Sequence, residues 1–171
     1  MFCQSTIGNG GVASGNLGSA TNAATNLVLG GGTLKYTGVT ATSDRAFTIT
    51  GSTTGTIDVP TGVSLTLAGA TGTATNGALT KVGSGSLNLS GVNTYTGTTT
   101  ISAGTLTVSG LLSDSSAVVA TGTYNLGSSD TILSLSGVGS VNLNSYILTA
   151  GWSTDTTYAG VLSGTGGLTK T

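Results

Sequence analysis

The side chains that could carry out chemistry in this chain are few and widely spaced. The 171 residues include five aspartates, at positions 44, 58, 114, 130 and 155, but no glutamate and no histidine. Without histidine there is no Ser–His or Cys–His pair, and the side chain that usually exchanges protons near neutral pH is missing. A pair of carboxylates on one surface is the remaining option, since acid–base and glycoside-cleaving sites are built from such pairs.

Stacking of the chain on itself could bring three of these residues, Asp114, Asp130 and Asp155, onto one edge. The competing interpretation is that each is a turn residue whose carboxylate hydrogen-bonds its own backbone. Their wide spacing in the sequence favours the turn interpretation. We therefore predict no catalytic residues, and we predict that the protein is not an enzyme.

Metal and cofactor sites find no better support in the sequence. Zinc sites are built from sets of cysteine and histidine, whereas this chain has the single cysteine Cys3, which also excludes an internal disulfide and is interpreted as incidental. The glycine–aspartate nonapeptide that binds calcium in other parallel solenoids does not occur. Ser84-Gly85 is one of many similar pairs, so its glycine is interpreted as a corner and not as part of a phosphate loop. We expect no metal site and no bound cofactor.

The basic residues limit the possible partners. The net charge is −1, and Lys35, Lys81, Lys170 and Arg45 form no stripe that would neutralise phosphates, so we expect no nucleic-acid partner. Asp44-Arg45 lies between two expected strands, and we interpret it as a solvated corner pair that contributes about 0–1 kcal/mol. No apolar run approaches the roughly 18 residues that a membrane-spanning helix needs.

The aromatic side chains allow two interpretations. They could stack against sugar rings, or they could pack inside the fold, which is the interpretation we favour for a lone tryptophan that follows Gly151. The residues concerned are Trp152, Tyr36, Tyr95, Tyr124, Tyr146 and Tyr158.

The elements that hold these residues are short runs of alternating side chains. In 86–89 and 105–108 every second residue is apolar and the others are Ser, Thr or Asn, which is the period of a half-buried strand. Glycine stands beside nearly every run, where the chain must turn sharply. Only 5% of residues are charged and 37% are hydrophobic, the reverse of the balance typical of disordered chains. No segment has a helical apolar period, so we predict an all-β fold.

Several neighbouring runs begin eight residues apart, as at 57 and 65, 79 and 87, and 133 and 141. Eight residues make about one strand and one tight corner, and three such sides give a coil of roughly 20–25 residues. The chain would then hold about six to eight coils in a stack about 30–40 Å long. A β-sandwich is the alternative, but the Asn-Gly signal of hairpins occurs only at 9–10 and 76–77.

A narrow core of stacked Leu, Val and Ile would hold this solenoid together. Asn88 and Asn93 are candidates for amide stacking between coils, and Pro60 should lie at a strand end because it cannot donate to a ladder. Residues 1–26 carry only the widely spaced Ile7, Val12 and Leu17, which fits weak strands at the start of the stack.

The clearest pattern covers residues 77–106. This segment resembles the autotransporter-associated β-strand repeat of large bacterial surface and secreted proteins, and 27–70 resembles the kind of cassette that accompanies it. The resemblance implies a right-handed parallel β-helix within a long passenger region, usually in many copies. The matching positions are Leu79-Thr80-Lys81, Gly83, Gly85, Leu87, Leu89, Ser90-Gly91, Asn93-Thr94-Tyr95, Gly97, Thr98, Ile101, Gly104, Thr105 and Leu106.

A further copy of the pattern begins at residues 166–171. Gly-Gly-Leu-Thr-Lys-Thr in this segment repeats Gly-Ala-Leu-Thr-Lys-Val of 77–82, 89 residues further along the chain. We therefore expect one β-solenoid segment over 1–171 with a truncated repeat at 166–171. The resemblance implies a location on the bacterial cell surface or outside the cell. No charged and apolar leader precedes the first strands, so we expect the export signal to lie outside this chain.

Three functions fit these expectations. The favoured one is a structural and adhesive segment of a surface protein, with self-association through the end coils because unpaired strand edges template further strands. The alternative is the subunit of an extracellular head-to-tail filament, since such contacts do not close. A threonine-rich face that binds ice or glycans is the third. It requires Thr-x-Thr at the same place in successive coils. Residues 98–100 and 105–107 are threonine-rich in this way, whereas 86–90, 133–136 and 141–145 carry Ser or Asn.

Overall fold

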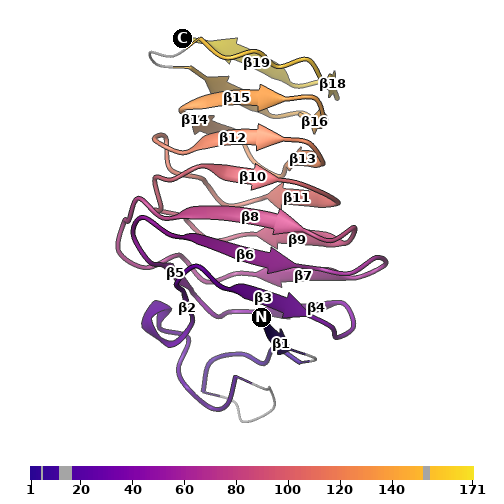
Figure 1. Ribbon diagram of the computed structural model, residues 1–171. Coiled ribbons are helices and arrows are strands. Elements are labelled where there is room, and N and C mark those ends of the chain that lie inside the picture. Colours follow the sequence, from indigo (N-terminus) through magenta and orange to yellow (C-terminus); the bar gives the residue numbers. More distant parts are fainter. Residues whose placement is uncertain (5, 12–16, 152–154) are drawn as a thin grey trace.

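The computed structural model describes residues 1–4, 6–11, 17–151 and 155–171, and shows a stack of β coils (Figure 1). Every pairing between its strands is parallel, and strands that pair lie about one coil apart in the sequence. Helical structure in the described residues is limited to one short 3-10 turn, Ala24–Asn26. The predicted all-β, parallel β-solenoid fold is therefore confirmed, and no described helix is long and apolar enough to cross a membrane.

Two seven-stranded sheets form the long sides of the stack. The first sheet lies at the front of Figure 1 and the second behind it. The first consists of β1 (Phe2–Gln4), β3 (Thr33–Tyr36), β6 (Thr54–Asp58), β8 (Ala78–Val82), β10 (Thr99–Ile101), β12 (Ala117–Ala120) and β15 (Ser134–Gly137). The second consists of β4 (Ala41–Ser43), β7 (Ser64–Leu67), β9 (Ser86–Leu89), β11 (Thr105–Val108), β13 (Thr123–Leu126), β16 (Ser140–Asn142) and β18 (Val161–Ser163).

The third side of the stack is less regular. A three-stranded sheet, here called the third sheet, contains β14 (Asp130–Ile132), β17 (Ile147–Ala150) and β19 (Gly167–Lys170). Near the N-terminal end this side holds only the pair β2 (Val28–Leu29) and β5 (Thr48–Ile49), and between the two lies an isolated bridge from Val92 to Leu111. Backbone pairing on this side is therefore replaced in part by other contacts.

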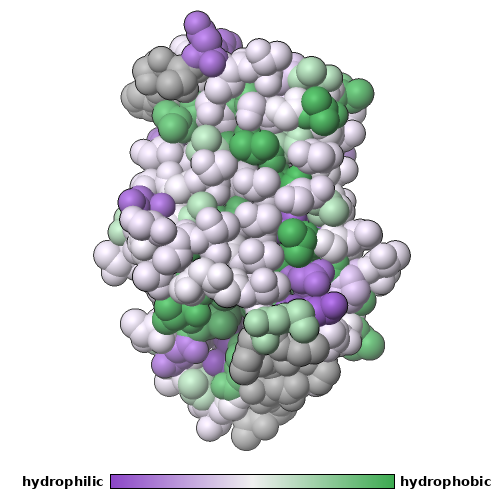
Figure 2. Space-filling model, viewed as in Figure 1, coloured by the Kyte–Doolittle hydropathy of each residue, from purple (hydrophilic) through white to green (hydrophobic). Residues whose placement is uncertain are grey.

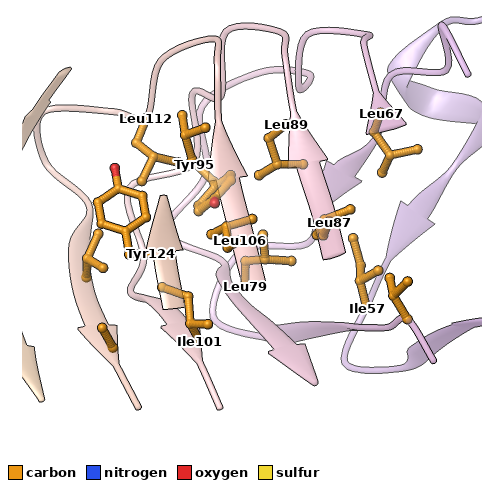
Figure 3. Packing of buried hydrophobic residues seen from close by; sticks show 14 of the residues in the cluster. Ile57, Leu67, Leu79, Leu87, Leu89, Tyr95, Ile101, Leu106, Leu112 and Tyr124 are labelled. Carbon is orange, nitrogen blue, oxygen red and sulfur yellow. The ribbon is translucent and has the colours of Figure 1, made fainter. Parts of the chain in front are cut away.

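The alternation of side chains produces the core. In β9 and β11 the polar residues are half-buried on the outside and the apolar ones fully buried, so that Leu87 stacks on Leu106 and Leu89 on Val108. Figure 3 shows these side chains filling the space between the sheets. Burying each contributes about 1.5–3 kcal/mol, and the repetition of one register through the coils makes this a continuous apolar column.

The coils are not all the same size. Leu65 pairs with Leu87, 22 residues further on, whereas Tyr124 pairs with Val141, only 17 residues further on. Some coils are thus shorter than the predicted range, because the corners and the third side lose residues. The corners stay tight: Gly104 has φ +66°, and a Cβ there would collide with the carbonyl oxygens of Gly85 and Gly83 in the coil before it.

The interpretation of Asp44-Arg45 as a solvated pair is wrong. Arg45 is only 1% exposed, and its guanidinium donates to four backbone carbonyls of the N-terminal segment: Nε to Gly8 at 2.9 Å, Nη1 to Ala20 at 3.2 Å and to Thr21 at 3.4 Å, and Nη2 to Gly18 at 2.6 Å. The Asp44 carboxylate instead accepts the N–H of Gly10 at 2.7 Å. The five donors of arginine suit such a cluster of carbonyls, and they attach the least regular part of the chain to the stack.

Two further expectations concern the N-terminal half. Pro60 follows the end of β6, as predicted for a residue without an N–H. Within residues 1–26, β1 pairs with β3 and Ile7 is buried in the core, whereas Val12 lies outside the described residues.

Candidate functional site

From β7 to β16 the outer face of the second sheet is polar and carries no charge in its described strands. The outward residues form two columns that cross the coils in register, one of Ser and Thr and one of Thr and Asn. The first is Ser64, Ser86, Thr105, Thr123 and Ser140, and the second is Thr66, Asn88, Thr107, Asn125 and Asn142. Hydroxyl and amide groups can donate and accept hydrogen bonds, so this face can contact a partner without desolvating a charge.

Hydrogen bonds along this face connect successive coils. Asn125 Nδ2 donates to Thr107 Oγ1, and Asn144 Nδ2 donates to Asn125 Oδ1, both at 3.2 Å. The prediction that Asn88 stacks amide on amide is wrong, because threonines precede and follow it in register and its Oδ1 accepts from a serine, Ser109. Asn93 is buried and donates to the carbonyl of Leu111. The same side chain also donates to the carbonyl of Gly91, so it adds to the backbone bond from its own N–H to Leu111.

The outer face of the first sheet, shown in Figure 2, is mostly of intermediate hydropathy. It carries one column of threonines, Thr33, Thr56, Thr80 and Thr100, that is in register over four coils and ends at Val119. Beside Thr80 on the same strand, the outward residues are Ala78 and Val82. A regular Thr-x-Thr array over successive coils is therefore absent from this face.

Lys81 is a buried cation in the matched repeat. It is 0% exposed, and its Nζ donates to the carbonyls of Val82 and Gly83, both at 2.7 Å, and of Ala103 in the next coil at 3.3 Å. Burial lowers the pKa of the Lys81 amine to about 8, while the nearby Asp58 carboxylate acts in the opposite direction. Its bonds are all to backbone, so this lysine closes a corner between two coils.

Asp130 is the buried carboxyl of the molecule, at 6% exposure. Oδ2 accepts the N–H of Leu112 at 3.1 Å, and Oδ1 accepts the N–H of Thr131 at 3.0 Å. Burial raises the pKa of Asp130 to about 6, and these two N–H groups oppose the rise. Both oxygens are committed to the backbone, so the group is poorly placed to act on an outside substrate.

The predicted edge of three aspartates forms only in part. Asp114 and Asp130 line one shallow hollow of about 290 Å³ on the third side, together with Thr131 and Thr149. Asp155 is exposed and does not line it. In the described residues no three Asp, Glu, His or Cys side chains lie close enough to hold a metal ion.

Most tyrosines are packed inside, so they cannot serve as sugar-stacking platforms. Tyr36, Tyr95 and Tyr124 are at most 2% exposed. The Tyr95 hydroxyl forms a 3.0 Å hydrogen bond with Thr99 Oγ1. Tyr146 and Tyr158 are partly buried against the core, and Trp152 lies outside the described residues.

Sequence reasoning missed the three buried charged residues, although a signal for them existed. Arg45 precedes Phe47 and Ile49 at intervals of two, and Lys81 follows Leu79 in the same way. Asp130 likewise precedes the buried Ile132 by two residues. In a strand this period places all of them on the inward side.

The coil edges leave apolar side chains uncovered. Leu162 on β18 is 41% exposed, and Leu168 on β19 is 43% exposed. Their partners in the preceding coil, Val141 and Leu148, are completely buried. The same positions are thus covered wherever another coil lies on top.

Comparison with known proteins identifies a repeat family and a relative. Residues 79–108 match the passenger-associated-transport-repeat family. Over 95% of its length the chain is 42% identical to part of the adhesin BmaC autotransporter of Brucella suis biovar 1 (strain 1330), and it spans 5% of that relative's length. No solved structure matches the chain. The resemblance noted in the sequence is therefore confirmed: this chain carries a passenger-associated transport repeat and is similar along nearly its whole length to a segment of an autotransporter adhesin.

Proposed function

We propose that this chain is a non-enzymatic, structural and adhesive segment of a bacterial cell-surface or secreted β-solenoid protein, and that its end coils associate head to tail. The observation that carries the adhesive part is the uncharged outer face of the second sheet, where hydroxyls and amides are held in register over the coils. The similarity to part of a relative named as an adhesin supports it.

Adhesion is tested by attachment of beads that carry the purified chain to host cells and to immobilised glycans. The first variant replaces Thr107 and Asn125, which lie in register on the second sheet, by lysine. The control replaces Thr80 and Thr100, which lie in register on the first sheet, in the same way. We expect attachment to fall only with the second-sheet variant. Equal attachment by both variants and the unchanged chain would contradict the use of this face.

The proposed self-association depends on the uncovered apolar edge at β18 and β19. Strand edges with free N–H and C=O groups pair with further strands, and covering Leu162 and Leu168 would remove apolar surface from water. A head-to-tail contact is heterologous and open, so a filament subunit is the alternative form of the same proposal.

Charging the edge tests this association. The variant carries Leu162→Lys and Leu168→Lys, and the control carries Val92→Lys, at a residue that is 52% exposed and bridges Leu111 in the middle of the stack. In sedimentation velocity we expect concentration-dependent oligomers for the unchanged chain and the control, and monomers for the edge variant. Electron microscopy then separates short oligomers from long fibres. A monodisperse unchanged chain would overturn self-association and leave the adhesion experiment unaffected.

A further inference from the structure

The outer face of the third side combines a column of hydroxyls with apolar side chains. On β17 the outward residues Ile147 and Thr149 lie two positions apart. Thr149 pairs in register with Thr131 of β14 before it and with Thr169 of β19 after it, so three threonines form one column across the coils. Leu111 and Ile147, which are 44% and 52% exposed, line the same hollow as the first two of these threonines.

Two shallow hollows lie over this column and share a carboxylate. The first is the hollow of about 290 Å³ described above. The second, of about 370 Å³, is lined by Asp114, Thr131, Thr149 and Thr171. Because Asp114, Thr131 and Thr149 line both hollows, the two adjoin and form one groove along the third side, here called the third-side groove.

The polar groups of the third-side groove are open to a ligand. The hydroxyls of Thr131 and Thr149 make no hydrogen bond with the described residues, and neither does the exposed carboxylate of Asp114. Asp130 also lines the groove, but its two oxygens already accept backbone N–H groups. Asp114 therefore carries the carboxylate that a ligand in the groove can use.

Hydrogen bonds hold the sides of the groove in place in the free chain. Asp114 lies within a turn that is closed by the bond from the Ser116 N–H to the Ser113 carbonyl at 2.8 Å. On the other side, the N–H of Ile147 donates to Oγ of Ser129 at 3.1 Å, and both of these residues line the groove. Groups that are already ordered lose less conformational freedom when they bind a ligand.

The size and chemistry of the groove fit a sugar better than a protein. A protein interface uses about 20–30 residues on each side, whereas seven and four residues line the two hollows. A sugar ring carries C–H groups on its faces and hydroxyls around its rim, so its faces can pack on Leu111 and Ile147 while its rim bonds with the threonine hydroxyls and the carboxylate. Among the described residues that line the two hollows none is Lys or Arg, so an acidic sugar would be repelled.

We propose that the third-side groove is a binding site for oligosaccharides, and that it takes neutral oligosaccharides in preference to acidic ones. Asp114 accepts hydrogen bonds from the sugar hydroxyls, and Thr131 and Thr149 both donate and accept. The same carboxylate sets the preference, because it faces an acidic sugar with a like charge. This site is separate from the outer face of the second sheet and does not depend on adhesion by that face.

An array of neutral oligosaccharides and their sialylated forms tests the proposal, with the purified chain carried on fluorescent beads. We expect the beads to bind neutral oligosaccharides and to bind the sialylated forms several-fold less. Asp114→Ala should weaken binding by about tenfold or more, because it removes a charged hydrogen-bond acceptor. Thr149→Val keeps the shape of the side chain and should weaken binding several-fold.

Two matched controls change residues outside the groove. Asp155→Ala removes an exposed aspartate, and Thr100→Val removes an outward threonine of the first sheet; both should bind like the unchanged chain. Circular dichroism should show the same β signal in all four variants. The proposal is wrong if no neutral oligosaccharide is bound, if the groove variants bind as well as their controls, or if the sialylated forms are preferred.

The double lysine variant at Thr107 and Asn125 separates this site from the face of the second sheet. Loss of oligosaccharide binding in that variant, with full binding in Asp114→Ala, would assign the sugar to the second sheet and overturn the groove while leaving the adhesive function intact. As a direct check, NMR amide shifts on addition of the best-bound neutral oligosaccharide should be largest at Asp114, Thr131 and Thr149. Shifts confined to the second sheet would refute the site.

Discussion

Arg45 shows how one side chain can hold a segment that has little regular structure of its own. The guanidinium donates at once to the carbonyls of Gly8, Gly18 and Ala20, which belong to the described part of the N-terminal segment. Because the charge has no carboxylate partner in these bonds, its burial depends on all of them being made. The N-terminal segment and the arginine therefore stabilise each other.

Replacing Arg45 by lysine tests this dependence. Lysine keeps the charge but presents one ammonium in place of a planar fork of donors, so we expect a loss of about 1–3 kcal/mol in unfolding free energy. Limited proteolysis with mass spectrometry should show earlier cleavage before residue 22. The control is Lys35→Ala. The Lys35 ammonium forms a partly exposed 3.7 Å ion pair with Asp58, and removing this pair should lower the unfolding free energy by at most about 1 kcal/mol. Equal proteolysis of both variants would argue against the anchoring role.

At the scale of the element, each strand has one face in the core and one in water, and β9 allows the two to be compared directly. Leu89 is 1% exposed, whereas Asn88 beside it is half-buried on the outer face. An aspartate at position 89 would be an unpaired buried carboxylate, which costs several kcal/mol. We expect Leu89→Asp to lose the β signal in far-ultraviolet circular dichroism and Asn88→Asp to keep it. An unchanged signal in Leu89→Asp would show that this core position is wrongly assigned.

The strands also show how far the sequence alone could predict the structure. Alternation located β9 and β11 and the inward face of each, because a strand has only two faces. The same rule places Arg45 on the inward side, in contrast to the interpretation of Asp44-Arg45 as a solvated pair. Lys81 and Arg45 each lie two residues from a buried apolar residue, so they fall on the inward side of the alternation. Their burial, however, depends on carbonyls from other coils. Such partners become neighbours only through coil lengths and corner geometry, which local patterns do not determine.

The molecule as a whole is stabilised by packing and hydrogen bonds, with very little contribution from ion pairs. Among the described residues, Lys35–Asp58 is the one ion pair, and both side chains are partly exposed. Salt screens such pairs, so raising sodium chloride from about 0.05 to 0.5 M should change the unfolding midpoint by no more than about 2–4 °C. Differential scanning calorimetry measures this. A fall of more than about 10 °C would reveal an electrostatic contribution that the structure does not contain.

The change in coil size has a geometric consequence. Coils shorten from 24 residues between Ala41 and Leu65 to 17 between Tyr124 and Val141, and the last one lengthens again to 21 between Val141 and Leu162; Figure 1 shows the widest corner loops around β6 to β8. The stack therefore has a shortest coil that lies nearer its C-terminal end than its N-terminal end. Copies joined end to end would therefore repeat the same change of width once per copy. Because this change is not symmetric within a copy, it would make the direction of the chain visible along a fibre.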